Sequence, residues 1–274
     1  MGILKPLAFG AAVAGCCVPS VLSAQASADQ RQSQVWGLQG LRSGYCVRFV
    51  IDQRAATREL KPGFRVVPAS QDAALHPALQ HLIQGQPEFA GWVPSSLCFY
   101  FTDAVQVGNR RVVEKNPRNQ QMLAVWTLAT QEERSGSRRD LALGIFSGRG
   151  SLIHAAEAAG VRLHEADAAV LDSADSANDV YTIKLERTSL MWRGRPTGDS
   201  SRVERPIEES WLVPGVRGGV WAVRLMLSPV WSRPLVGSLT VEGKGDLAKA
   251  LKASPIRFVG PLYRSGAGEL RFSR

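Results

Sequence analysis

The stretch GYCVRFVI, residues 44–51, packs aromatic, β-branched and cysteine residues into one nearly apolar run. This composition is typical of a buried β-strand. A second run of the same character, SLCFYFT at residues 96–102, carries another cysteine. Both runs are bounded by residues that favour turns. We therefore expect two cysteine-bearing strands in the N-terminal half, and the meaning of those cysteines depends on where the protein is located.

The first thirty residues have the layout of a secretory signal peptide. Lys5 precedes an uncharged apolar run that ends at Leu22, and alanines at positions 24, 26 and 28 form A-x-A cleavage sites. Pro19 and several small residues make this run less suitable as a membrane-spanning helix. We expect residues 1–26 to be a cleaved signal peptide and residues 27–35 to be a flexible linker.

A second interpretation of the leader involves lipid attachment. VAGC at residues 13–16 resembles a bacterial lipobox, in which Cys16 would be acylated and would anchor the mature chain to a membrane. Cys17 and the apolar residues that follow it are unusual for a tether, which favours simple cleavage. Both outcomes predict an exported protein, either periplasmic or, if Cys16 is acylated, membrane-anchored.

Export makes a disulfide the simplest expectation for the remaining cysteines. Once the leader is removed, Cys46 and Cys98 are the two cysteines of the mature chain. An even pair in an oxidising compartment favours a bond, which would contribute about 3–4 kcal/mol by closing a long loop. Two buried free thiols are the alternative. A catalytic thiol is not supported, because apolar surroundings raise a thiol pKa and neither cysteine has a histidine nearby in sequence.

The mature chain as a whole predicts an α+β, β-dominated fold with antiparallel or mixed sheets and a few short helices. The strand candidates are residues 45–51, 64–67, 97–107, 122–128, 141–146, 180–186, 221–227, 238–241, 256–259 and 269–272. The helix candidates are residues 73–84, 151–159 and 246–253. The polar stretch at residues 131–140 separates an N-terminal half, residues 36–130, from a C-terminal half, residues 140–274, as a domain boundary or a long hairpin loop.

An internal repeat lies in the C-terminal half. GRGSLIHAAEAAGVRL, residues 148–163, aligns without a gap with GKGDLAKALKASPIRF, residues 243–258. The pattern predicts a repeated β-α-β unit, with one leucine and two alanines of each helix on its buried side. Neither copy matches a phosphate-loop motif, and Asp246 would repel a phosphate. A corner of the fold is therefore favoured over a ligand site.

The basic composition favours anionic partners. The chain has 33 Lys and Arg against 24 Asp and Glu, a net charge of +9. Such a surface suits an acidic protein face or an anionic lipid or glycan, with peripheral membrane association, although a general preference for arginine is the alternative. The candidate anion contacts are Arg149, Lys244, Arg193 and Arg195. Export and the lack of a recognisable module exclude nucleic acid.

No catalytic motif stands out in the sequence. His154 and Glu157 share one predicted helix face, but no H-E-x-x-H spacing indicates zinc, and we expect neither a metal nor a cofactor. A G-x-S-x-G nucleophile elbow is absent. Glu208 and Glu209 are the nearest carboxylate pair, yet neighbouring residues of a strand point to opposite faces.

A chain without a recognisable catalytic motif is more typical of a binding protein than of an enzyme. We expect an exported, non-catalytic envelope protein with a binding or scaffolding role. One alternative is an accessory subunit docked on a membrane protein complex. A second alternative is a secreted hydrolase whose site forms only in three dimensions.

The leader and the cysteines are tested together by the intact mass of the protein secreted from its host. We expect a mature N-terminus near residue 27 and a mass that rises by two hydrogens on reduction. A mass shift matching a lipid on Cys16 would establish acylation instead. An unprocessed N-terminus with both thiols freely alkylated would contradict export and the disulfide alike.

Overall fold

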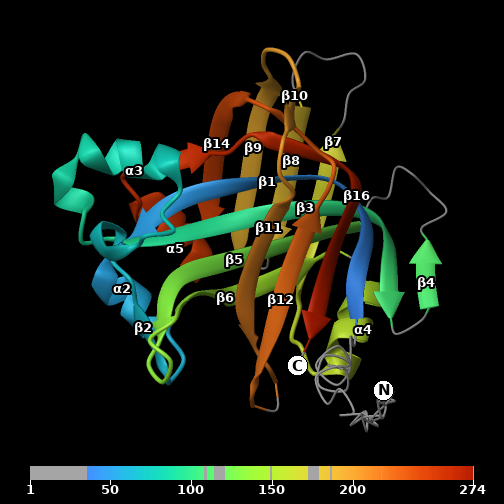
Figure 1. Cartoon of the computed structure of the whole chain (residues 1–274), viewed down its shortest axis with the longest axis horizontal. Helices are drawn as coiled ribbons and strands as arrows, with labels where there is room; N and C mark the ends of the chain where they lie inside the picture. The colour runs from blue at the N-terminus through green and yellow to red at the C-terminus, as the bar shows by residue number, and fades with distance from the viewer. Residues whose placement is uncertain are drawn as a thin grey trace, which may run out of the picture. The chain divides into compact units, whose positions relative to one another are not determined.

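Strands dominate the protein, and the predicted α+β, β-rich class is confirmed. The computed structural model describes residues 36–107, 110–113, 121–148, 150–171, 179–185, 187–216 and 218–273. Figure 1 shows long, strongly curved strands with a few short helices at their ends. Among the described residues, no helix has the length and apolar character needed to cross a bilayer.

The strands, in chain order, are β1 (Trp36–Ile51), β2 (Phe64–Val66), β3 (Val93–Val107), β4 (Arg110–Val113), β5 (Gln121–Glu132), β6 (Arg138–Ser147), β7 (His164–Leu171), β8 (Asp179–Leu185), β9 (Thr188–Pro196), β10 (Ser201–Val203), β11 (Ile207–Pro214), β12 (Val220–Leu227), β13 (Val230–Arg233), β14 (Leu235–Gly243), β15 (Arg257–Val259) and β16 (Leu262–Ser273). The α-helices are α2 (Gln53–Arg58), α3 (Pro77–Gln84), α4 (Gly150–Ala159) and α5 (Asp246–Ala253). Two 3₁₀ turns, Ala69–Gln71 and Pro87–Phe89, flank α3.

Seven of the described strands close into a barrel. The neighbours run β6, β11, β12, β16, β1, β3 and β5, and β5 pairs again with β6. The ladders are antiparallel except for β6 with β11, which is parallel. A closed barrel leaves none of these strands with an unpaired edge along the closure.

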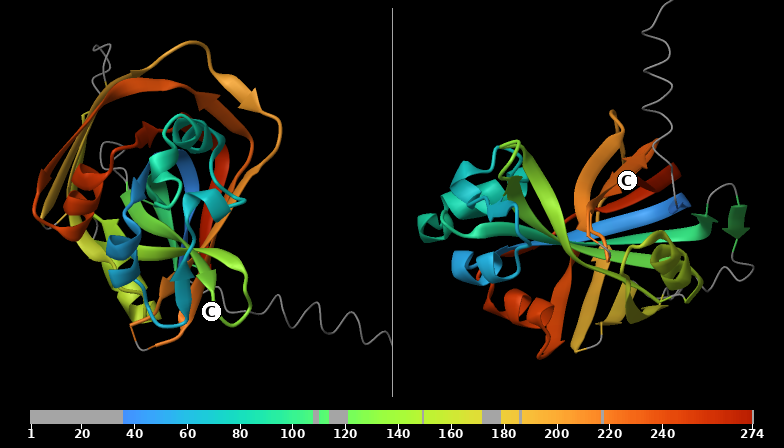
Figure 2. Two further views of the ribbon diagram at one scale, coloured as in Figure 1. Left: turned by 90° about the vertical axis from the view of Figure 1, so that its left-hand side faces the viewer. Right: turned by 90° about the horizontal axis from the view of Figure 1, so that it is seen from below.

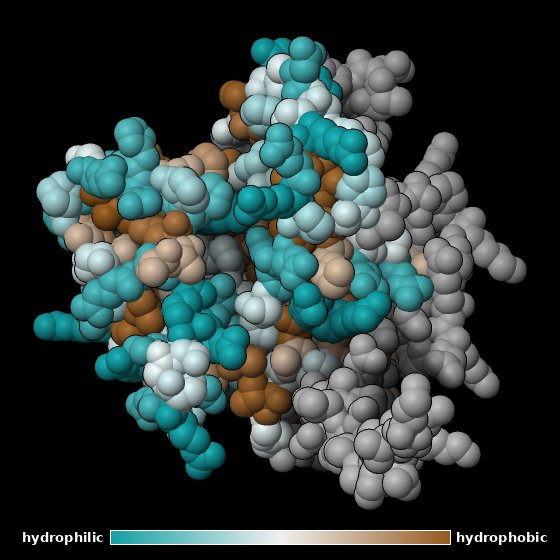
Figure 3. All heavy atoms as spheres, viewed as in Figure 1, coloured by the Kyte–Doolittle hydropathy of each residue, from teal (hydrophilic) through white to brown (hydrophobic). Residues whose placement is uncertain are grey.

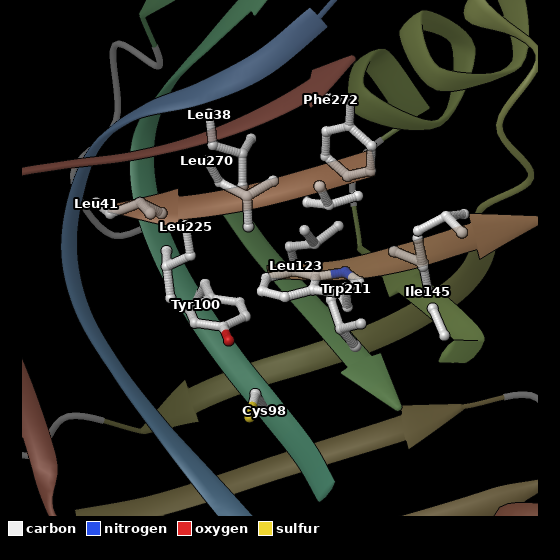
Figure 4. Packing of buried hydrophobic residues seen from close by; sticks show 14 of the residues in the cluster. Leu38, Leu41, Cys98, Tyr100, Leu123, Ile145, Trp211, Leu225, Leu270 and Phe272 are labelled. Carbon is white, nitrogen blue, oxygen red and sulfur yellow. The ribbon is translucent and has the colours of Figure 1, made fainter. Parts of the chain in front are cut away.

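Alternation along β1 builds two separate cores. Tyr45, Val47 and Phe49 point outward into one cluster, whereas Cys46 points inward into another. The inner cluster fills the barrel, and Figure 4 shows its side chains converging from several strands. Its members include Leu38, Leu41, Tyr100, Leu123, Trp211, Leu225, Leu270 and Phe272. GYCVRFVI is therefore apolar on both faces because both faces are buried.

A second sheet covers the outer face of the barrel. β7 continues from β6 as a parallel neighbour, and β8, β9 and β14 follow in antiparallel order. Leu190 of this sheet and Leu247 and Leu251 of α5 pack in the outer cluster with the aromatic residues of β1 and β3. Figure 2 shows α5 and β14 beside the barrel strands from two further directions. The outer core thus holds β1 and β3 in place from behind.

Both copies of the internal repeat form a strand, a turn, a helix and a strand. Leu152 of α4 and Leu247 of α5 are buried, as predicted, but the prediction for the alanines was wrong, because the aligned Ala158 and Ala253 are exposed. Only the first copy returns beside the strand it left, because β15 pairs with β1 instead. The turn into α5 requires glycine at Gly243, which has a φ of 104° and where a Cβ would overlap the Arg187 carbonyl.

The predicted disulfide is present. Cys46 and Cys98 lie directly opposite each other on β1 and β3 and are bonded. The polar stretch at residues 131–140 is the hairpin region between β5 and β6 rather than a linker between domains. Figure 3 shows mainly hydrophilic side chains on one face of the protein, with hydrophobic ones in small separate areas.

Reduction of the disulfide should destabilise the fold. The bond closes a loop of 52 residues, so its loss should lower the free energy of unfolding by about 3–4 kcal/mol. Denaturant titrations of the oxidised protein, the reduced protein and a C46A/C98A variant would measure this. The reduced protein and the variant should have similar midpoints, both below that of the oxidised protein. Equal midpoints for the oxidised and reduced forms would contradict a stabilising bond.

Candidate functional site

A cavity of about 420 Å³ lies at one end of the barrel. Arg48, its lining residue on β1, lies in the part of β1 that pairs with β15 rather than with β16. One side of the cavity is formed by the covering segment, residues 72–79, which leads into α3. The lining residues are Arg48, Asp72, Ala74, Leu75, His76, Pro77, Leu79, Pro94, Ser95, Ser96, Cys98, Tyr100, Val125, Thr127, Arg138, Asp140, Glu208, Glu209, Ser210 and Trp211. A volume of this size accommodates a small organic molecule.

The inward positions of five barrel strands form a polar belt around the cavity. Its members are Arg48 on β1, Ser96 on β3, Thr127 on β5, Asp140 on β6 and Glu209 on β11. The strand register places Arg48 opposite Ser96 and Ser96 opposite Thr127, and the last two hydroxyls lie 2.8 Å apart. The belt lies beside the apolar interior, so an otherwise hydrophobic barrel has one charged end.

Arg48 is the cation in the middle of this belt. Its Nη2 lies 3.8 Å from Oε1 of Glu209. Its Nη1 is buried and has no hydrogen-bond partner within the described residues. Gly260 leaves room for this nitrogen, because a Cβ at Gly260 would lie 2.8 Å from it. Arg48 also lines the cavity, and a guanidinium in such a place is suited to recognising a carboxylate.

Glu209 also contacts Tyr100 from across the barrel. The Tyr100 hydroxyl donates to Oε2 of Glu209 at 3.4 Å. Trp211 stacks on Tyr100 with ring centroids 6.0 Å apart and planes within 6°. Figure 4 shows the Tyr100 hydroxyl directed toward the end of the barrel where Cys98 lies, away from Leu270 and Phe272. The aromatic stack therefore fixes the direction in which the phenol presents its proton.

The two carboxylates of the belt hold their protons more tightly than usual. Burial raises the pKa of Glu209, although the Arg48 guanidinium opposes this. Burial also raises the pKa of Asp140, against the effect of Arg138. Burial and the nearby Glu209 raise the pKa of Tyr100 well above its usual range, so the phenol stays protonated. Raised carboxyl pKa values in a cavity are typical of acid–base sites.

An ion pair fastens the covering segment to the barrel. Asp72, whose side chain is 1% exposed, accepts two hydrogen bonds from Arg138, at 3.0 Å to Nε and 2.9 Å to Nη2. Nη1 of Arg138 also lies 2.6 Å from Asp140. One guanidinium thus holds both the cover and a carboxylate of the polar belt.

The described lining of the cavity supplies proton donors and acceptors. Among the described residues, no group of three or more His, Cys, Asp or Glu side chains could hold a metal ion. The described lining contains no lysine. Glu209 and Asp140 can accept protons, and Tyr100 can donate a hydrogen bond. This set is suited to moving a proton on a small molecule held near Arg48.

Two of the four candidate anion contacts can be compared with the cavity. Lys244 and Arg195 are exposed and do not line the cavity. Arg193 belongs to β9, but its side chain lies outside the described residues, as do Arg149 and Cys16 altogether. A role for these residues toward an anionic partner stays a prediction.

Sequence reasoning reached Glu209 but not its partners. Glu208 and Glu209 both line the cavity, but their partners differ: Glu208 pairs with Arg224 at 2.7 Å, whereas Glu209 contacts Tyr100 and Arg48. Arg48 and Tyr100 were missed, and the signal for Arg48 was a lone charge within the apolar run GYCVRFVI. His154 is exposed, with 83% of its side chain accessible, so a metal site there gains no support.

The fold of this chain is similar to the folds of enzymes whose structures have been solved. An acetoacetate decarboxylase from Legionella pneumophila subsp. pneumophila str. Philadelphia 1 is similar, with a TM-score of 0.51, 10% identity, and coverage of 87% of this chain and 84% of that one. The enduracididine biosynthesis enzyme MppR, complexed with pyruvate, has a TM-score of 0.47, 14% identity, and coverage of 86% and 87%. An acetoacetate decarboxylase-like enzyme from Sphingomonas wittichii RW1 has a TM-score of 0.44, 10% identity, and coverage of 88% and 91%. No protein-family model and no curated protein sequence matches the chain.

These findings correct the functional expectation. The likeness to acetoacetate decarboxylase, which at 10% identity concerns the fold, contradicts the prediction of a non-catalytic binding or scaffolding protein. The alternative of a docked accessory subunit falls with it, and the similar protein is a decarboxylase rather than the hydrolase of the second alternative. The search for catalytic motifs in the sequence missed this site for a physical reason. The polar belt comes from five strands that are far apart in sequence, so it leaves no local motif.

Replacing Glu209 by glutamine should stabilise the protein at neutral pH. The folded state binds the Glu209 proton more tightly than the unfolded chain, so stability falls as the pH rises from the ordinary pKa of 4.5 through the folded value. Glutamine resembles the neutral acid and can still accept from Tyr100. The free energy of unfolding of Glu209→Gln should exceed that of the unmodified protein at pH 7 and approach it below pH 4.5.

The matched control is Glu208→Gln, on the exposed face of the same strand. Its pair with Arg224 is half-exposed, so the change in unfolding free energy should stay within about 0.5 kcal/mol. If Glu209→Gln were less stable at pH 7, or its effect did not depend on pH, the raised pKa of Glu209 would be refuted.

Proposed function

We propose that this protein is an enzyme that moves a proton next to the carbonyl group of a small oxo acid, inside the barrel cavity. One observation carries the proposal: Glu209 lies within hydrogen-bond reach of Tyr100 and 3.8 Å from Arg48, in a cavity that raises its pKa. A base, a hydrogen-bond donor and a cation therefore converge on one small volume.

Each of the three groups has a distinct role. Arg48 attracts the carboxylate of the substrate and sets its position. Glu209 in its ionised form removes a proton from the carbon beside the carbonyl, and its raised pKa makes it a stronger base than an exposed glutamate. Tyr100 stays protonated, and when the substrate is bound it turns its single proton from Glu209 to the carbonyl oxygen as negative charge develops there.

The step is balanced within these residues. The C–H bond breaks, its proton goes to the Glu209 carboxylate, and its electron pair forms the C=C bond of an enolate. The former carbonyl electrons rest on the oxygen that Tyr100 faces. Return of the proton from Glu209 to the same carbon regenerates the oxo acid.

The substrate class is supported by the fold comparison. Acetoacetate decarboxylase, by its name, acts on an oxo acid, and its fold is similar to that of this chain. Amine catalysis through a Schiff base would need a lysine at the cavity, and the described lining provides none. Hydrogen bonding and acid–base catalysis by Tyr100 and Glu209 therefore supply the chemistry in this proposal.

We place this enzyme outside the cytosol. The Cys46–Cys98 bond is compatible with an oxidising compartment, and the leader has the pattern of a signal peptide. Cleavage near residue 26 would leave the enzyme in the periplasm, and acylation of Cys16 would tether it to a membrane.

Hydrogen–deuterium exchange tests the proposal without knowledge of the final product. Pyruvate, 2-oxobutyrate and acetoacetate would each be incubated in D₂O with the oxidised protein, and loss of the proton signal beside the carbonyl followed by NMR. We expect at least one to exchange faster than in buffer. Glu209→Gln should slow this exchange by about 10²–10⁴-fold.

Two further variants separate the roles. Arg48→Met should raise the concentration of oxo acid needed for half-maximal exchange, because the carboxylate loses its partner. Glu242→Gln is the control, because Glu242 is exposed on β14 and does not line the cavity, and it should exchange at the unmodified rate. If no oxo acid exchanged above the buffer rate, or Glu209→Gln were as active as the unmodified protein, the proposed function would be wrong.

A further inference from the structure

A histidine from the covering segment also lines the cavity. His76 precedes α3 as its N-cap, and its Nδ1 accepts a hydrogen bond from the Ala78 backbone N–H at 3.2 Å. Its ring also packs against Phe258, with centroids 5.6 Å apart. Two contacts on different elements thus fix both the position and the tilt of the imidazole.

The contact with Ala78 fixes the tautomer. A nitrogen that accepts a backbone N–H carries no proton, so the neutral ring bears its proton on Nε2. Burial and the neighbouring Arg48 lower the pKa of His76 to about 4. At neutral pH the side chain is therefore an uncharged donor whose N–H is at Nε2.

The charged groups around the cavity agree with a neutral ring. Arg48 on β1 disfavours a second cation, Glu209 on β11 is balanced by Arg48, and Asp140 on β6 is engaged by Arg138. On its own segment, Asp72 is occupied by the same Arg138. No carboxylate among these is paired with His76 to hold it in the charged form.

Helix capping alone does not account for an imidazole at this position. Ser, Thr, Asp and Asn are the residues that usually cap a helix N-terminus, and each is smaller than histidine. Histidine adds a second nitrogen, at Nε2, on a ring that lines the cavity. The choice of residue is explained if that second nitrogen is used.

We infer that His76 is a further catalytic residue: its neutral imidazole donates the Nε2 hydrogen bond to the carbonyl oxygen of the bound oxo acid, together with Tyr100. This inference rests on the proposed function and adds a second donor to it. A neutral donor stabilises negative charge on the enolate oxygen without giving its proton away. Arg48 still supplies the positive charge that binds the carboxylate of the substrate.

The test uses the full oxidised protein and its exchange activity. His76→Asn keeps a good helix cap and removes the Nε2 donor. We expect its saturating exchange rate to fall by about 100-fold, with little change in the half-saturating concentration. His81→Asn is the matched control on the same helix; His81 is exposed and does not line the cavity, so its variant should retain the full rate.

A spectroscopic readout separates catalysis from capping. In ¹⁵N NMR, His76 should show the Nε2–H tautomer at pH 7, and its Nε2 resonance should move when a saturating oxo acid is added. A titration midpoint near 4 is expected for the free protein. A structural cap would keep its tautomer but would not respond to the oxo acid.

The possible failures can be told apart. If the unmodified protein exchanges an oxo acid and His76→Asn matches it, or if the ring carries its proton on Nδ1, the role of His76 is wrong and the proposed function stands. If the unmodified protein exchanges none, both are wrong. A 100-fold loss confined to His76→Asn, with the shifted Nε2 resonance, supports the inference.

Discussion

A guanidinium placed inside a closed barrel is the constraint on which the rest of the cavity depends. Arg48 faces inward because it alternates with Val47 and Phe49, whose burial in the outer core fixes the register of β1. Burial is the main cause of the altered pKa values of Glu209, Asp140, Tyr100 and His76. Among the described residues, Arg48 is the one cation that acts on all four, favouring the ionised acids and the neutral imidazole.

The fold supports this charged end by surrounding it with apolar packing. The inner core lies on one side of the polar belt, and the outer core holds the same strands from behind. The Cys46–Cys98 bond joins β1 to β3 on the inner face of the barrel. The next pair on that face is Arg48 opposite Ser96, two residues further along β1. Buried charges cost stability, and the two cores and the disulfide offset that cost. Catalytic groups in such a setting are expected to be locally destabilising.

The sequence predicted elements well where the signal was local. The runs around Cys46 and Cys98 became paired strands with a disulfide, and residues 246–253 became a helix at the predicted bounds. The helix expected over residues 73–84 begins later, at Pro77, because His76 caps it and the preceding residues form an irregular cover. Closure of the barrel was not predictable, because it depends on pairings between strands that are distant in sequence, such as β1 with β16.

The candidate site was out of reach for the same reason. Glu209 was noticed as one of two adjacent acids, but its importance depends on Arg48 and Tyr100, which come from other strands. The polar belt exists only once five strands are in register. A charged residue alternating with buried apolar ones, as Arg48 does in GYCVRFVI, was the available clue.

The most direct test of this account is a titration of the Glu209 carboxyl carbon by ¹³C NMR, in the unmodified protein and in Arg48→Met. The account predicts a midpoint above the ordinary 4.5 in the unmodified protein and a higher one when Arg48 is absent. A midpoint at or below 4.5, or one that does not respond to the loss of Arg48, would contradict it.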